Sequence, residues 1–164
     1  METKFEIVPV PTRILTHHDD IVEAIVEYGG DKIGPDDVVC VAESVVAITQ
    51  GGAKRSEDFK PGLLAKVLCR LFPSKGSISG WHSMQALIDA EGGMRVLIAV
   101  ICGFATKCVG VSGVFYRMAG EQARLIDDVT GTMPPYDKHI VYGPHNPDRL
   151  PRILPAAQVL LERQ

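Results

Sequence analysis

Several features that would assign this chain to a specialised class of protein are absent from its sequence. It contains no Cys-x-x-Cys pair, and its basic residues do not exceed its acidic ones, with 17 Lys+Arg against 20 Asp+Glu. A formal net charge of −3 gives no general basic field for nucleic acid or anionic lipid. The longest apolar stretch, residues 96–105, is about half of the ~20 residues that a membrane-spanning helix needs. We therefore expect no nucleic-acid partner and no contact with a membrane.

The cysteines and the first residues both favour a cytoplasmic protein. Most of the cysteines lie inside apolar runs, where the residue behaves as a small hydrophobe, so we expect four reduced thiols. Glu2 and Glu6 stand where a secretory signal would have a basic flank and an apolar segment. The cysteines are Cys40, Cys69, Cys102 and Cys108.

The composition is that of a folded domain. The chain has 164 residues, 46% of them hydrophobic and 23% charged, which excludes a disordered composition. A chain of this length usually folds as one unit, so we expect a single domain over residues 1–164.

Apolar periodicity and turn residues predict a mixture of helices and strands, in an α/β or α+β fold. Asp19 and Asp20 are expected to cap the first helix, and Gly29-Gly30 to end it. Continuous β-branched or apolar runs are interpreted as buried strands. The predicted helices are 21–28, 63–71, 81–91 and 148–163, and the predicted strands are 5–8, 38–48, 96–102, 114–116, 124–126 and 139–142.

Two glycine-containing loops are candidate phosphate sites. Residues 51–56 combine free backbone amides with Lys54 and Arg55, and residues 74–80 precede a predicted helix start. An ordinary solvated loop is the favoured interpretation of each, because glycine mainly marks turns.

Histidines and acidic pairs are candidates for proton transfer and metal binding. His82 opens a predicted helix, where it would act as a base or contact a phosphate. Asp127-Asp128 follows a predicted strand. Two carboxylates at this place would either hold Mg²⁺ or belong to an ordinary turn, and neither interpretation is favoured. His17-His18-Asp19-Asp20 is more readily explained as a helix-capping surface than as a metal site.

Glu43 is unusual because it interrupts the apolar run 38–48. In a strand, this carboxylate would face solvent on one side of a sheet or be buried beside a cation. Arg13 and Arg117 are available as partners.

The order of these segments is similar to that of a known family. The stretches VPVPTRILTHHDD, DDVVCVAESVVAITQGG, SMQALIDAEGGMRVLIAVICGFATKCVGVSGVFYRMAG and GTMPPYDKHIVYGPHNPD resemble the coenzyme F-420 glutamyl ligase family, in a shorter and divergent branch. The resemblance covers most of the chain and implies an α+β domain with a mixed sheet, flanking helices and an intertwined dimer.

The resemblance also implies a reaction. Proven family members use GTP and Mg²⁺ or Mn²⁺ to activate a carboxylate as an acyl phosphate and join glutamate to a phosphorylated small molecule. If this chain is an enzyme of that family with a rearranged site, Glu43 or His82 would move protons, and Asp127 and Asp128 would hold the metal. The residues expected to bind the nucleotide or substrate are Arg13, Ser44, Gln50, Gly51, Lys54, Arg55 and Arg117.

Several charges that the family uses are replaced in this chain. The family's polar nucleotide contact would fall at Glu43, its two lysines at Ser44 and Ile48, and its metal-binding aspartate at Ser112. Two hypotheses follow. The chain is a ligase-like enzyme with a rearranged site, or it is a non-catalytic metabolite-binding or assembly module that kept the fold and lost the standard nucleotide site.

Overall fold

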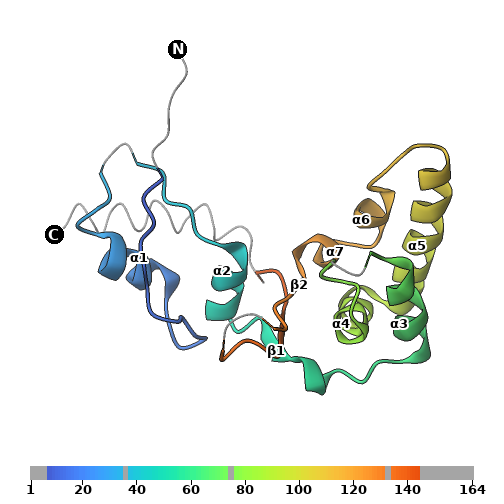
Figure 1. Ribbon diagram of the computed structural model, residues 1–164, viewed down its shortest axis with the longest axis horizontal. Helices are drawn as coiled ribbons and strands as arrows, with labels where there is room; N and C mark the ends of the chain where they lie inside the picture. Colours follow the sequence, from blue (N-terminus) through green and yellow to red (C-terminus); the bar gives the residue numbers. More distant parts are fainter. Residues whose placement is uncertain (1–6, 35–36, 74–75, 132–133, 145–164) are drawn as a thin grey trace, which may run out of the picture. The chain divides into compact units, whose positions relative to one another are not determined.

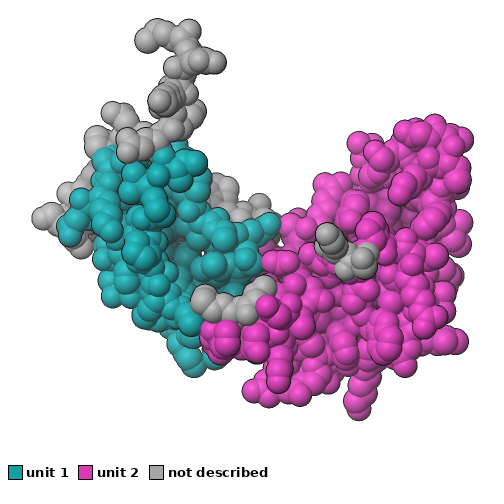
Figure 2. Space-filling model, in the orientation of Figure 1, with its two compact units in different colours: residues 1–51, 146–164 teal, residues 52–145 magenta. Residues whose placement is uncertain are grey.

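A computed structural model describes residues 7–34, 37–73, 76–131 and 134–144. The described chain divides into two compact units, one within residues 7–51 and the other within residues 52–144 (Figure 2). All four cysteines are free. Across these described ranges, no helix is long and apolar enough to cross a membrane.

The first unit contains α1 (Ile21–Gly29) and α2 (Glu43–Thr49) (Figure 1). The predicted capping of α1 is confirmed, because the Asp20 carboxylate accepts hydrogen bonds from the backbone N–H groups of Val22 and Glu23. Gly30 follows the last helical residue, as the sequence predicted. A small apolar cluster holds this unit together, and its buried members are Leu15, Ile21, Ala24, Ile25 and Val46.

The extended arm before α1 is fixed by an ion pair. Both guanidinium nitrogens of Arg13 donate to the Asp19 carboxylate, at 2.6 and 3.0 Å. The backbone N–H and the hydroxyl of Thr16 donate to the same carboxylate. The hydrogen bonds from Arg13, and then those from Thr16, hold the pKa of Asp19 well below its ordinary value. Asp19 therefore stabilises the arm while it is ionised.

The second unit combines several helices with a small sheet (Figure 1). Its strands are β1 (Ala53–Arg55), β2 (Asp127–Asp128) and β3 (His139–Val141), in the order β1-β3-β2 with both pairs antiparallel. Its helical elements are η1 (Ser56–Asp58), α3 (Leu63–Leu68), η2 (Cys69–Leu71), α4 (Trp81–Glu91), α5 (Gly93–Cys108), α6 (Val114–Met118) and α7 (Gln122–Leu125).

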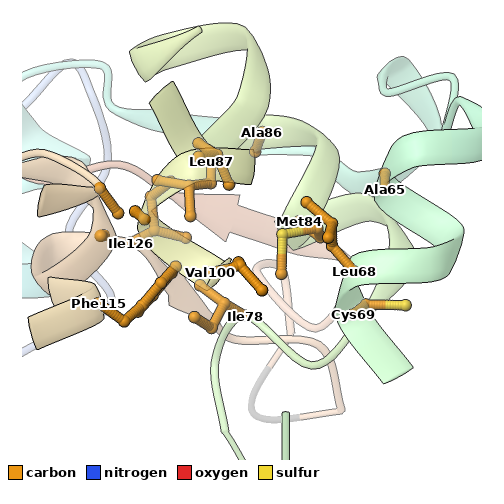
Figure 3. Close-up of a cluster of buried hydrophobic side chains, with 14 of the residues drawn as sticks. Ala65, Leu68, Cys69, Ile78, Met84, Ala86, Leu87, Val100, Phe115 and Ile126 are labelled. Atoms are coloured by element: carbon orange, nitrogen blue, oxygen red, sulfur yellow. The ribbon is translucent and has the colours of Figure 1, made fainter. Parts of the chain in front are cut away.

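Helix α4 lies at the centre of this unit. Met84, Ala86 and Leu87 on α4 have no exposed surface. They pack into one cluster with residues of α3, α5 and the later helices, among them Leu68, Val100, Phe115 and Ile126 (Figure 3). Burial of this apolar surface is the main source of stability of the second unit.

An ion pair between the end of α4 and the start of α5 holds the segment between α6 and α7. Glu91, at the end of α4, accepts hydrogen bonds from Arg95 and from the backbone N–H of Gln122, each at 2.8 Å. Arg95 also donates to the carbonyl oxygen of Met118. Gly120 lies against the Glu91 carboxylate with a φ of +110°, so the close approach and the backbone conformation both require glycine.

The α+β class is confirmed, whereas several predicted strands are wrong. The run 96–102 lies inside the sixteen-residue helix α5, 114–116 begins α6, and 124–126 overlaps the end of α7. The described strands are all antiparallel, where a mixed sheet was expected. The strand predicted at 139–142 is confirmed as β3, and the helices predicted at 63–71 and 81–91 correspond to α3 with η2 and to α4.

The predicted strand at 38–48 is also wrong, because residues 43–49 form α2. Val46 and Ala47 are buried on α2, so packing outweighs the β preference of the valines. Of the strand predicted at 5–8, residues 7 and 8 form none, and residues 5 and 6 lie outside the described residues. The predicted closing helix, 148–163, also lies outside them. The single-domain assignment and the dimer remain predictions.

Asp19→Asn should destabilise the protein at neutral pH. Folding lowers the pKa of Asp19, so the ionised carboxylate adds its full stabilisation to the folded protein above the ordinary carboxyl pKa of about 4. This stabilisation is lost as the pH falls through the lower pKa of Asp19 in the folded protein. Urea unfolding between about pH 7 and about pH 2 should show the stability gap between wild type and variant closing in acid. The matched Asp31→Asn change, at an exposed carboxylate, should leave the pH profile unchanged; a gap independent of pH would contradict this assignment.

Met84→Ala should lower the stability of the second unit by about 2–5 kcal/mol, because it leaves a cavity in the centre of the cluster. The free energy of unfolding from urea titration measures this loss. Leu63→Ala is the control, since Leu63 is 80% exposed on α3 and its truncation opens no cavity. Equal losses in the two variants would show that α4 is not the centre of the core.

Candidate functional site

Polar side chains gather in the second unit where β2 meets the loop that leads into α4. We call this group, formed by Ser77, Gly80, Asp127 and Asp128, the β2 edge. The Ser77 hydroxyl donates to Oδ1 of Asp127 at 3.3 Å. Both aspartates are half-buried. The two carboxylates are therefore held at the protein surface rather than sealed in the core.

Gly80 allows the close approach of the second carboxylate. A Cβ atom on Gly80 would lie 3.0 Å from Oδ2 of Asp128 and 2.9 Å from the Ser83 hydroxyl. The other oxygen of Asp128 accepts a hydrogen bond from the backbone N–H of Thr130 at 3.1 Å. A side chain at position 80 would thus require the Ser83 and Asp128 side chains to move.

His82 follows this glycine by two residues and lies in the first turn of α4. Its ring is half-buried, and its Nδ1 is buried without a hydrogen-bond partner among the described residues. Gly80 offers no side chain to cap α4, and no side-chain cap bond is present at this end. Of the predicted residues, Asp127 and Asp128 thus lie against the loop that leads into α4, and His82 follows that loop in the first turn of the helix.

This arrangement fits a weakly held divalent ion better than a metal cage built by the protein. No group of three or more His, Cys, Asp or Glu side chains that could hold a metal occurs in the described part of the chain. Mg²⁺ is commonly bound by one or two carboxylates together with water and substrate phosphates. Asp127 and Asp128 are the carboxylates of the β2 edge that such an ion would use.

Two of the cations predicted to bind phosphate already have partners in the second unit. The Lys54 ammonium lies 5.1 Å from the centre of the Tyr142 ring, and Arg55 pairs with Glu57 at 2.9 Å. The Arg55–Glu57 pair is largely exposed, so water and salt weaken it and a ligand can displace it. Arg117 is exposed in the last turn of α6.

Tyr142 stays protonated at neutral pH. Burial, followed by the charge of Asp89, raises the pKa of Tyr142 to about 12. Its hydroxyl donates to the carbonyl oxygen of Ala86 at 3.3 Å. The residue therefore ties β3 to α4 and offers its ring to Lys54, and it is no candidate for proton transfer.

The other predicted residues belong to the first unit. Glu43 is exposed in the first turn of α2, where its charge favours the helix N-terminus, so the expectation of a strand carboxylate is wrong. Arg13 is engaged by Asp19 and does not serve as a partner for Glu43. Ser44 is half-buried in α2, Gln50 caps its C-terminus, and Gly51 follows with a φ of +77°.

Two of the positions where the family's charges are replaced, Ile48 and Ser112, have different surroundings. Ile48 is 9% exposed at the end of α2, a place where a lysine would bury its charge. Ser112 is exposed in the turn between α5 and α6.

Sequence reasoning missed Ser77 and Gly80 as members of the site. The signal was the Ser- and Gly-containing loop 74–80 before a predicted helix, which was interpreted as a solvated turn. Nothing in the sequence indicated that this loop would contact Asp127 and Asp128, about fifty residues further along the chain.

Comparison with known proteins gives one family. A sequence model described as F420-0:gamma-glutamyl ligase matches residues 9–132. No curated protein and no solved structure matches the chain. The match covers most of the chain, including α1, α2, α4 and both aspartates of the β2 edge. The chain therefore belongs to the F420-0:gamma-glutamyl ligase family.

Proposed function

We propose that this protein is a ligase-like enzyme that forms an amide bond on a phosphorylated or acidic small molecule, with GTP and Mg²⁺ or Mn²⁺. Membership of a gamma-glutamyl ligase family supports the reaction class. The observation that carries the proposal for this chain is the β2 edge, where two half-buried carboxylates lie against the loop that leads to His82.

Asp127 and Asp128 would hold the metal ion in this proposal. When bound, the ion neutralises phosphate charge and orients the transferred group. The carboxylate of Asp128 beside Gly80 disfavours a bare phosphate at the start of α4, because two negative charges would meet there. A phosphate that arrives with its metal ion avoids this repulsion, which argues for a metal–nucleotide complex as the ligand.

His82 would accept the proton that the attacking amine loses as the amide bond forms. Its Nδ1 has no hydrogen-bond partner among the described residues, and the residue lies in the first turn of α4, directly after the loop of the β2 edge. General base catalysis by a positioned side chain typically contributes about 10²–10⁴ in rate. Lys54, Arg55 and Arg117 are the second unit's candidates for the phosphate and substrate charges.

The second candidate function is binding without turnover. The ion pair of Arg13 with Asp19, the contact of Lys54 with Tyr142 and the burial of Ile48 favour it, since each removes a cation from the family's phosphate-binding set. In that case Glu43, Ser44, Gln50 and Gly51 would bind no nucleotide. A ligand-dependent stability shift without product formation would support this second function.

GTP together with Mg²⁺ or Mn²⁺ should raise the thermal unfolding midpoint of the wild-type protein. A ligand at about 100 times its Kd stabilises the folded state by about 2.7 kcal/mol, which a thermal melt resolves easily. Asp127→Asn and Asp128→Asn should each abolish the shift, because each removes a metal-binding charge.

The control for these variants is Glu121→Gln, which removes an exposed carboxylate of the same unit outside the β2 edge and should keep the shift. GTP alone and the metal alone should have smaller effects than both together. The absence of any thermal shift in wild type would exclude the nucleotide-dependent enzyme. A thermal shift retained by both aspartate variants would show that the metal is bound by other residues.

His82→Gln should lower turnover by about 10²–10⁴ while it preserves the ligand-induced thermal shift, since the proton acceptor is lost and the binding charges remain. The assay combines protein, GTP, metal, glutamate and F420-0, with mass spectrometry for the glutamylated product and measurement of released phosphate. His18→Gln, at an exposed histidine of the first unit, should retain activity. Full turnover by the His82 variant would remove this residue from the mechanism.

A further inference from the structure

Helix α3, with the short helix η2 that continues it, exposes a row of apolar side chains. Leu63, Val67 and Leu71 follow one another at intervals of four residues, so they lie along one side of the helix. They are 80%, 50% and 46% exposed. Ala65 and Leu68, on the other side of α3, are buried in the core of the second unit. The packing of that core therefore does not account for the outer row.

A row of cations runs beside the apolar row. Lys66 and Arg70 are exposed, and each precedes a member of the apolar row by one residue. Among the described residues, no carboxylate forms an ion pair with either cation. The Lys66 ammonium lies 6.0 Å from the centre of the Trp81 ring, which is 51% exposed at the start of α4. We call this surface the α3 face, and its members are Leu63, Lys66, Val67, Arg70, Leu71 and Trp81.

The α3 face is positively charged, although the whole chain is not. Residues 59–88 contain four Lys or Arg residues and no Asp or Glu, whereas the chain has a formal net charge of −3. The first carboxylate of α4, that of Asp89, comes eight residues after Trp81 and accepts a hydrogen bond from Gln85 at 2.7 Å. A partner complementary to this face therefore supplies both apolar surface and negative charge.

We propose that the α3 face binds an acidic amphipathic helix of a partner protein. In an α-helix, apolar residues four positions apart form one row, and carboxylates one residue away from them form a second row beside it. Laid along α3, such a helix sets its apolar row against the apolar row of the α3 face and its carboxylates against Lys66 and Arg70. Trp81 borders the cations and supplies the aromatic anchor that is common in protein interfaces.

The regular spacing of the two rows favours a helix over other anionic partners. The apolar row spans about 12 Å from Leu63 to Leu71, at a rise of ~1.5 Å per residue, which is about two turns of a partner helix. Nucleic acid would use the cations through its phosphates and leave the apolar row without a partner. An anionic lipid surface would accept cations and apolar groups in any order, so it would not account for two parallel rows with the same interval.

The test uses the fluorescence of Trp81, which is the only tryptophan of the chain and therefore reports directly on this face. The probe is a synthetic peptide of about 16 residues, long enough to form a helix, with Leu at every fourth position and Glu on each side of every Leu. Titration of the peptide from about 1 µM to about 1 mM should shift the Trp81 emission of the wild-type protein to shorter wavelength. A peptide of the same composition in scrambled order should not.

Charge reversal tests the pairing of the rows. The double variant Lys66→Glu, Arg70→Glu should lose the response to the acidic peptide and gain one to a peptide in which every Glu is replaced by Lys. The matched control is Lys107→Glu with Lys138→Glu, at two exposed cations of the same unit outside the α3 face, and it should respond as wild type does. Leu63→Ser with Val67→Ser should respond to neither peptide, and circular dichroism reports whether each variant is folded.

The assay contains no nucleotide and no metal, so its failure would leave the proposed enzymatic function intact. Equal responses to the patterned and scrambled peptides, or an acidic-peptide response that survives charge reversal, would overturn the proposal. A larger response to a single-stranded oligonucleotide, or to vesicles of anionic phospholipid, than to the patterned peptide would also overturn it, because the face would then serve another class of partner.

Discussion

Burial of α4 is the constraint on which the second unit depends. Met84, Ala86 and Leu87 have no exposed surface, and the helix contacts α3, α5, α7 and β3. Because its middle is fixed by packing on several sides, its first turn is fixed as well. The loop before it, with Ser77 and Gly80, is consequently held against β2, and His82 follows that loop in the first turn of α4. The packing of the core thus positions the candidate site, although the residues of the site do not themselves stabilise the core.

The parts of the fold that were predictable are those with a local cause. Asp20 caps α1 through its own side chain, Gly30 follows the helix end, and the apolar period of α4 is visible in its sequence. The wrong strands share another cause. In the runs 38–48 and 96–102 almost every residue is apolar or β-branched, so neither a helical period nor an alternation is visible, and long-range packing decides. The helical spacing of Val96, Ala99 and Val100 becomes evident only once their burial is known.

The residues of the candidate site could be chosen from the sequence by their chemistry, but their arrangement could not. The structure sets Asp127 and Asp128 against the loop that precedes His82, and the roles of the three residues stay predictions. Arg13 was chosen for its charge, but Asp19, six residues away, takes that charge. Sequence identifies which groups are able to bind an anion, whereas the local partners that already bind those groups depend on side-chain geometry. Charge counting from sequence therefore overestimates the cations that are ready to bind phosphate.

The feature that made α5 difficult to predict also explains its exposed face. A helix that serves only the core of its own unit needs one apolar face, and its polar side makes the helical period visible. In α5 the apolar residues of the core-facing side, Val96 and Val100, are interleaved with those of the outer stripe, Ile98 and Ile101, which hides the period. In such a helix the burial of each residue, and not the sequence pattern, distinguishes the core-facing side from the outer side.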